Sequence, residues 1–480
     1  MKYNDKFAQQ AYDFNFDLLE PPLAPVVIVH ELNGEVGFEW TDISEVNPGD
    51  YPFQGYSVFQ CLSASDPGVR IANYDTIDGF AIILDEVLDP LTGVLEQRAV
   101  KFGTDNGVRR YFGTNVDFIN DGPLHNYTEY FYRIEAYSYS SDPLAAPKTL
   151  TSATIVNAIP QTPIAGTGTI FSFADTVPAS HISGRSDGAV LPLIMDPLAL
   201  TGNDYMVVFE EDISLGPVWH LYNLSTGDTV LFNQTNQLGD GYYPIVDGMF
   251  MHVAGPQLAV NTWAWEPDPG ARVITGVNAG LSGFFGGLGL GAEFFGTSLT
   301  PGEYVTIEVR WVPDGTGQNG YMYRRDLGYA YDGYFGNQNI TVWDVTSQPE
   351  RQVNFAFVEN YNPGNEDGQT IDSIWNGTSK IGLTVDSVGN PLPAALGGRE
   401  YLFPLLSDYS ATPLPQYTFD GALFNDSGSF DAVFALWAHA RSQEFGGGKP
   451  SPGEIFRFIP NFVNSTSDTF IFTATAPSLN

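Results

Sequence analysis

The sequence predicts an all-β protein, and three observations carry that prediction. Short apolar runs alternate with polar residues, as in residues 353–358, and a period of two is the pattern of a strand. Glycine and proline number 51 and 33 of 480 residues without a collagen-like repeat, which indicates many turns. The nearest candidate for a long amphipathic helix, residues 84–100, is interrupted by Pro90 and Gly93.

The first element is a polar, aromatic tail, residues 1–23, which runs into the sequence EPPLAP. Phe14 and Phe16 alternate with polar residues in the manner of a strand. Such a segment could add to an open sheet edge of a neighbouring molecule, and head-to-tail repetition would then build a filament. A frayed tail is the other interpretation.

Residues 24–160 contain five alternating segments, which resemble the strands of a fibronectin type III domain. "APVVIVHELNGEVGFEWTD" gives two strands, "FQGYSVFQCL" a third, and "YTEYFYRIEAYSYSS" and "KTLTSATIVNAIPQ" the closing pair. The resemblance implies that Trp40 is the core tryptophan of the second strand and that Tyr130 or Tyr132 forms the tyrosine corner. A long insertion rich in Asp and Gly departs from the family pattern, so the strand order between the third and sixth strands stays open.

Beyond residue 160 the chain resembles segments of very large bacterial surface proteins, many of which end in a sorting domain for type IX secretion. "SDGAVLPLIMDPLALTGNDYMVVFEE" and "ITVWDVTSQPERQVNFAFVEN" are two such segments. The two resemblances together imply a fibronectin type III-like β-sandwich followed by one or two further β-sandwich-type domains. The expected modules are 161–260 and 261–480, either separate or joined in one domain.

The expected location is the cell surface or the extracellular space, with a mature or truncated chain that shows no signal peptide. Twenty Lys and Arg against 56 Asp and Glu give a net charge of −36, which repels nucleic acid and anionic membranes. No run of about 18 apolar residues is present, so membrane insertion is not expected either. A saline or cation-rich environment suits such a surface. The alternative is that an acidic composition is common to the proteins of this lineage and has no specific role.

The sequence offers no catalytic residues and no organic cofactor site. Its six histidines are scattered without an HExxH pattern, and 56 carboxylates do not single out a catalytic pair. "GRSDG", residues 184–188, matches the G-x-S-x-G nucleophile elbow, but the β-like, proline-punctuated sequence after it favours a tight turn.

Calcium is the one cofactor that the sequence suggests, because hard oxygen ligands gather in two loops. Solvated turns are the alternative interpretation. The candidate ligands are Asp117 and Asp121 in "NVDFINDG", and Glu366, Asp367 and Asp372 in "GNEDGQTID".

Two further stretches are candidates for contacts between subunits. Phe284 and Phe285 lie in the apolar, glycine-rich residues 276–296, which could equally form a buried core connection. Arg324 and Arg325, an adjacent pair in a cation-poor chain, lie in a tyrosine-rich stretch that could instead stack on sugars.

Two functions remain open at this point. The first is a non-enzymatic structural or adhesive surface protein, with self-association or neighbouring surface proteins as partners and a filament as one form of assembly. The second is a secreted protein that binds or cleaves carbohydrate, with glycans as partners. Cys61 stands alone in the sequence and is expected to be a small buried hydrophobe.

Overall fold

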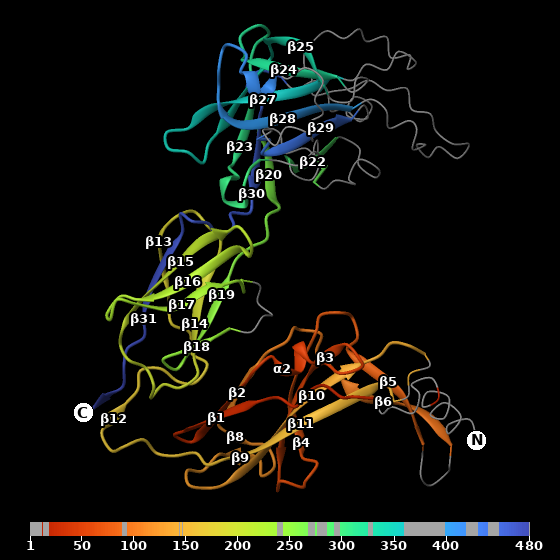
Figure 1. Cartoon of the computed structure of the whole chain (residues 1–480), viewed down its shortest axis with the longest axis vertical. Coiled ribbons are helices and arrows are strands. Elements are labelled where there is room, and N and C mark those ends of the chain that lie inside the picture. Colours follow the sequence, from red (N-terminus) through yellow and green to blue (C-terminus); the bar gives the residue numbers. More distant parts are fainter. Residues whose placement is uncertain are drawn as a thin grey trace. The chain divides into compact units, whose positions relative to one another are not determined.

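The computed structural model describes residue 12 and residues 19–88, 94–143, 145, 147–237, 243–266, 274–275, 286–291, 298–324, 330–359, 399–418, 431–439 and 451–479. The chain divides into two compact units. The first holds Met1–Ser183, Ala189–Ala254 and Asp468–Asn480, and the second holds Gly184–Gly188 and Gly255–Ser467. Both are built from mainly antiparallel sheets, so the all-β prediction is confirmed (Figure 1).

The first unit begins with a three-stranded and a four-stranded sheet that share one core. The smaller sheet has the order β1 (Val27–Leu32), β2 (Glu35–Trp40), β7 (Tyr111–Thr114). The larger has the order β11 (Thr149–Ala158), β10 (Tyr130–Tyr139), β3 (Phe53–Cys61), β4 (Val69–Asp75). Alternate residues of β2 and β10, among them Phe38, Trp40 and Tyr132, meet in the core because successive side chains of a strand point to opposite faces.

The insertion between β4 and β10 adds separate small elements to this sandwich. Among the described strands, β5 (Ile82–Leu88) and β6 (Leu95–Phe102) pair only with each other, and β8 (Val116–Asp117) pairs with β9 (Gly122–Pro123). A single helical turn, α2 (Ile43–Val46), connects β2 to β3. The same region also contains β7, which belongs to the smaller main sheet, so the additional elements are β5, β6, β8 and β9.

A second pair of sheets completes the first unit. The larger has the order β13 (Ser180–Ser183), β31 (Thr469–Thr473), β15 (Asp204–Asp212), β16 (Gly216–Asn223), β17 (Asp228–Gln234). The smaller has the order β14 (Ala189–Ile194), β19 (Met249–Ala254), β18 (Ile245–Val246), and β12 (Thr167–Gly168) pairs with β32 (Ser478–Leu479). The sequence predicts two modules, 161–260 and 261–480, each formed by one continuous stretch of chain. In the structure the last residues, Asp468–Asn480, belong instead to the first unit.

The second unit is organised around an 11-stranded sheet. Its main path is β20 (Val260–Glu266), β30 (Ile455–Pro460), β23 (Ile307–Trp311), β26 (Ile340–Asp344), β27 (Arg351–Glu359), β28 (Arg399–Asp408), β29 (Phe434–His439), β22 (Gly286–Leu290), β21 (Ile274–Thr275). β24 (Asn319–Arg324) pairs with β25 (Ala330–Asn337) and with β27. Short 3-10 turns occupy Pro301–Glu303 and Pro415–Tyr417.

Strand β27 shows why this sheet needs apolar residues on both faces. Val353, Phe355 and Phe357 enter one core cluster, whereas Ala356 and Val358 enter another on the opposite face. The sequence stretch that predicted a strand is therefore a central strand that is covered on both sides.

Candidate functional site

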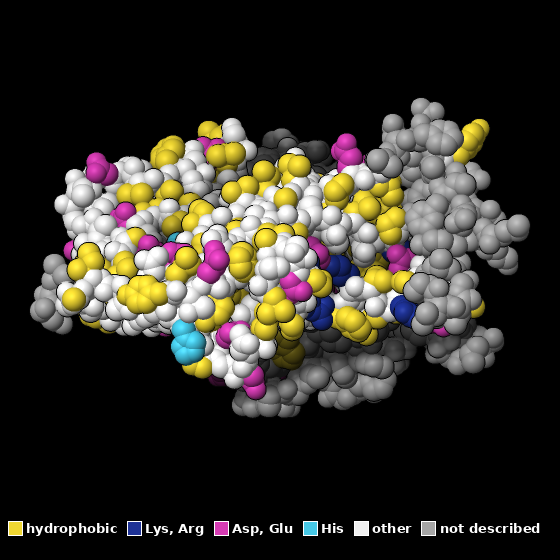
Figure 2. Space-filling view, turned by 90° about the horizontal axis from the view of Figure 1, so that it is seen from below, with side chains coloured by type: hydrophobic (Ala, Val, Ile, Leu, Met, Phe, Trp, Pro, Cys, Tyr) yellow, Lys and Arg dark blue, Asp and Glu magenta, His cyan; other side chains and the backbone are white. Residues whose placement is uncertain are grey.

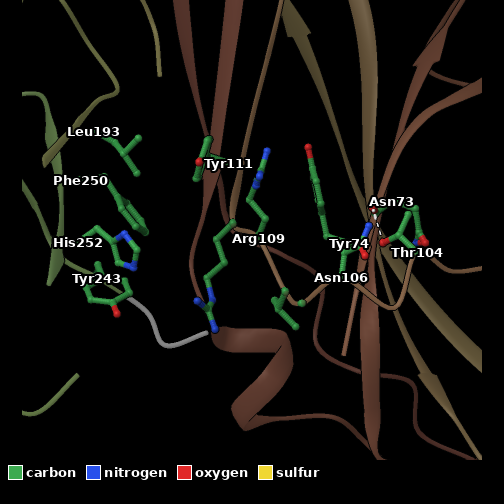
Figure 3. Close-up of a pocket in the computed structure, with 13 residues that line it drawn as sticks. Asn73, Tyr74, Thr104, Asn106, Arg109, Tyr111, Leu193, Tyr243, Phe250 and His252 are labelled. Carbon is green, nitrogen blue, oxygen red and sulfur yellow. Dashed lines mark hydrogen bonds between the residues drawn. The ribbon is translucent and has the colours of Figure 1, made fainter. Parts of the chain in front are cut away.

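The candidate site is a cavity of about 440 Å³ within the first unit. Figure 3 shows one wall from the β4 and β7 region and a facing wall from β14, β19 and the segment before β18. The first wall contributes Asn73, Tyr74, Thr104 and Asn106–Tyr111, and the second contributes Leu193, Tyr243, Phe250 and His252.

Near the pocket, an aromatic ring packs directly against the backbone of two glycines, and this contact holds the two walls together. Gly37 and Gly113 are direct partners in β2 and β7, and the ring of Phe173 lies over both. A Cβ at either glycine would come within 2.3 Å of that ring, so only glycine permits this approach. Tyr111 continues the contact, with its ring centroid 6.0 Å from that of Phe250.

Arg109 is the cation of the pocket. Its guanidinium carbon lies 5.2 Å from the ring centroid of Tyr74 and 5.1 Å from that of Tyr111, so it is held between two tyrosines (Figure 3). No ion pair joins Arg109 to a carboxylate among the described residues. Burial raises the pKa of Tyr74, and the nearby Arg109 charge offsets part of that effect.

Arg110 has a different environment, although it is adjacent in the sequence. Its Nε donates to Oε1 of Glu45 at 2.7 Å, and its side chain is only 4% exposed. The Tyr56 hydroxyl donates to the same Glu45 oxygen at 2.9 Å. The charge of Arg110 is thus neutralised inside the protein, and Arg109 carries the uncompensated charge of the pair.

The facing wall supplies a neutral polar group. Nε2 of His252 is buried and has no hydrogen-bond partner among the described residues. Burial lowers the pKa of His252 below its ordinary value of 6.5, so the ring is neutral at pH 7. Its ring is held edge-on by Tyr243, with centroids 4.7 Å apart.

The chemistry of the lining favours an anion with an apolar face. The described lining residues include two arginines and one histidine, but no aspartate or glutamate. That composition is unusual for a chain with 56 acidic residues. Aromatic walls with a few placed polar groups are typical of small-molecule sites.

Of the predicted calcium ligands, Asp117 ends β8 and Asp121 lies in the turn before β9. Asp117 is buried, and its oxygens accept hydrogen bonds from Gln60, from the N–H groups of Ile119 and Asn120 and from the Asn120 side chain. Burial alone would raise the pKa of Asp117, but these donors together lower it. In the part of the chain that is described, no three His, Cys, Asp or Glu side chains are grouped to hold a metal ion.

Most other predicted site residues fall outside the described residues. They are Glu366, Asp367, Asp372, Phe14, Phe16, Phe284, Phe285 and Arg325. Arg324 ends β24, where its backbone pairs with Ala330 and Glu359. The calcium and interface assignments therefore stay predictions.

"GRSDG" forms a bend between β13 and β14, and no helix follows it. Ser186 is buried, and its hydroxyl bonds to Asn464 and accepts from the N–H of Gly188 at 2.8 Å. The tight-turn interpretation fits this serine. Cys61 is buried, as expected.

Comparison of the chain with protein-family models and with curated proteins finds no match. Within the described residues, no helix has the length and apolar character needed to cross a membrane.

Proposed function

We propose that this chain is a non-enzymatic extracellular surface protein of structural and adhesive type, which holds a ligand in the pocket around Arg109. The observation that carries the proposal is the single uncompensated guanidinium between Tyr74 and Tyr111. A cation fixed between two rings is preorganised, so little side-chain entropy is lost when a ligand binds it.

The same pocket favours binding over cleavage of a sugar chain. Glycoside hydrolysis generally uses two carboxyl groups that flank the scissile bond. The described lining residues contribute arginine, histidine, tyrosine and asparagine to the cavity, but no carboxyl group. Recognition by stacking, charge and hydrogen bonds is the function that these groups serve.

The fibronectin type III resemblance supports the surface location. The three-stranded and four-stranded sheets share a core that contains Trp40, which is 2% exposed. The hydroxyl of Tyr130, at the start of β10, accepts a hydrogen bond from the N–H of His125 at 3.0 Å, as a tyrosine corner requires. Figure 2 shows acidic side chains scattered over one face with few basic ones, which suits a soluble exterior.

Retention on immobilised polysaccharides tests the proposal. Columns carrying neutral, carboxylated and sulfated polymers are compared for the wild type, Arg109→Ala and Arg98→Ala. Arg98 is a matched control because it is half exposed on β6 and pairs with Glu96. We expect at least one polymer to retain the wild type and Arg98→Ala, but not Arg109→Ala. Equal retention of all three proteins, or of none, would contradict adhesion through this pocket.

Assembly into a filament is a second proposed function, favoured by one open strand. β17 is the last strand of its sheet, and its Val230 and Phe232 side chains are 36% and 62% exposed. An unpaired edge with apolar side chains can accept a further strand, and the proposed donor is the segment around Phe14 and Phe16. Deletion of residues 1–20 should abolish any ordered polymer seen by electron microscopy, and a strictly monomeric full-length chain would contradict assembly.

We also propose that calcium stabilises the protein, and this proposal rests on the acidic loops of the sequence. The melting temperature should be higher in calcium than in chelator at matched ionic strength, because an ion bound by these loops would neutralise their negative charge. Equal melting temperatures would leave ionic screening as the sole effect.

A further inference from the structure

We infer that the ligand of the Arg109 pocket is a carboxylated sugar, of the uronic acid type, within an acidic polysaccharide. This inference rests on the proposed adhesive function and specifies its ligand. It is drawn from three features of the cavity: a guanidinium without an ion-pair partner among the described residues, an apolar surface opposite it, and two neutral polar side chains that make no hydrogen bond with a described residue.

The guanidinium selects a carboxylate. Tyr74 and Tyr111 cover the two faces of the Arg109 group, so the N–H groups on its edge are what a ligand can reach. That edge presents parallel donors whose spacing matches the two oxygens of a carboxylate. A neutral sugar would leave this charge without a partner.

The wall opposite Arg109 suits the apolar face of a sugar ring. In Figure 3, Leu193 and Phe250 lie on the far side of the cavity from Arg109, and Tyr111 lies between. Sugar rings present a patch of C–H groups on one face, and such a patch packs against aromatic and aliphatic side chains. A small inorganic anion would leave this wall uncovered.

Two polar side chains of the cavity make no hydrogen bond with a described residue and could bind hydroxyl groups of the sugar. Asn106 is exposed and makes no hydrogen bond with a described residue, and Nε2 of His252 is buried without a partner. Neutral imidazole can donate or accept, and the amide can do both. A ligand hydroxyl at Nε2 would satisfy a polar atom that otherwise stays unbonded.

Phosphorylated or heavily sulfated polymers fit the cavity less well. They are best bound by several cations, whereas Glu45 already neutralises Arg110 and leaves one free positive charge. The net charge of −36 also repels a densely anionic polymer. A single carboxylate per sugar unit matches a single guanidinium.

Isothermal titration calorimetry with a galacturonate oligosaccharide and its methyl ester tests this inference. The ester keeps the sugar ring and removes the charge. We expect the acid to bind at least tenfold more tightly than the ester. Arg109→Gln should remove that preference, Arg109→Lys should restore part of it, and Arg98→Gln should leave it intact. The melting temperature of each variant establishes that it is folded.

The results separate the inference from the proposed function. Equal binding of acid and ester, or tighter binding of a sulfated oligosaccharide or of a glutamate-rich peptide, would overturn the uronic acid assignment while adhesion through the pocket stands. Absence of binding to every probe, with no effect of the Arg109 variants, would overturn both.

Discussion

Nε2 of His181 lies 3.0 Å from Oδ1 of Asp468, although the two residues are 287 positions apart in the sequence. The imidazole ring also stacks on Phe470, with ring centroids 4.2 Å apart. Asp468 is fully buried and immediately precedes β31, which lies between β13 and β15. Strand β31 is therefore an internal strand of a sheet whose other strands lie far earlier in the sequence.

Removal of Asp468–Asn480 should unfold the second sandwich of the first unit. The deletion takes Phe470 and Phe472 out of its core and leaves β13 and β15 without their common partner. Differential scanning calorimetry should show the loss of one transition, while that of the second unit persists. Deletion of residues 478–480 alone is the control, and identical thermograms for the two deletions would contradict this prediction.

Trp40→Ala should destabilise the first sandwich by about 3–5 kcal/mol, because it empties a large volume in the core. Trp40→Phe should cost less, since it keeps a ring and removes a buried N–H that has no partner among the described residues. Leu62→Ala, at a 70% exposed position, is the control. Urea unfolding measures all three, and a change below about 1 kcal/mol for Trp40→Ala would mean that the tryptophan does not fill the core.

Arg110→Met should cost about 3 kcal/mol, because it leaves the Glu45 carboxylate partly buried without its guanidinium partner. The double variant Glu45→Met with Arg110→Met should recover much of that loss, since no charge then remains uncompensated. Free energies of unfolding for the two single variants and the double variant form the thermodynamic cycle. Strict additivity of the two losses would show that the ion pair is not coupled.

His252 should titrate below its ordinary pKa of 6.5, because burial disfavours the charged ring. The folded protein then binds this proton more weakly than the unfolded chain does. The stability that neutral His252 contributes is therefore present above pH 6.5 and is lost as the pH falls below it. Proton NMR should show one histidine resonance with a lowered pKa that is absent from His252→Gln. A resonance assigned to His252 that titrates at or above 6.5 would contradict this.

The strands of the fold could be predicted because burial imposes a local period. In β10, Tyr130, Tyr132 and Ile134 alternate with less buried residues, and in β27 the same period separates two core clusters. The position of β31 could not be predicted in this way. Its own pattern indicates a strand, but its partners β13 and β15 are chosen by tertiary packing.

The pocket could not be predicted from the sequence, for a related reason. Its residues come from separate stretches of sequence, and no local pattern joins Arg109 to His252. A signal did exist, since Arg109 and Arg110 are adjacent cations in a cation-poor chain. Arg324 and Arg325 show the same pattern, so adjacency alone does not locate the pocket. Glu45 pairs with Arg110 and leaves Arg109 without an ion-pair partner among the described residues. The contact with Glu45 depends on the tertiary fold and is not apparent from the sequence.

The return of β31 to the first unit also determines how the protein would carry a mechanical load. Apart from the short segment Gly184–Gly188, the chain enters the second unit after Ala254 and leaves it before Asp468, and both of these residues belong to the first unit. A pulling force between the two ends of the chain would therefore pass through the first unit, across the hydrogen bonds of β31 with β13 and β15. The long segment of the second unit, Gly255–Ser467, would then come under tension only after β31 was pulled out of its sheet, so it would act as a reserve length of folded chain.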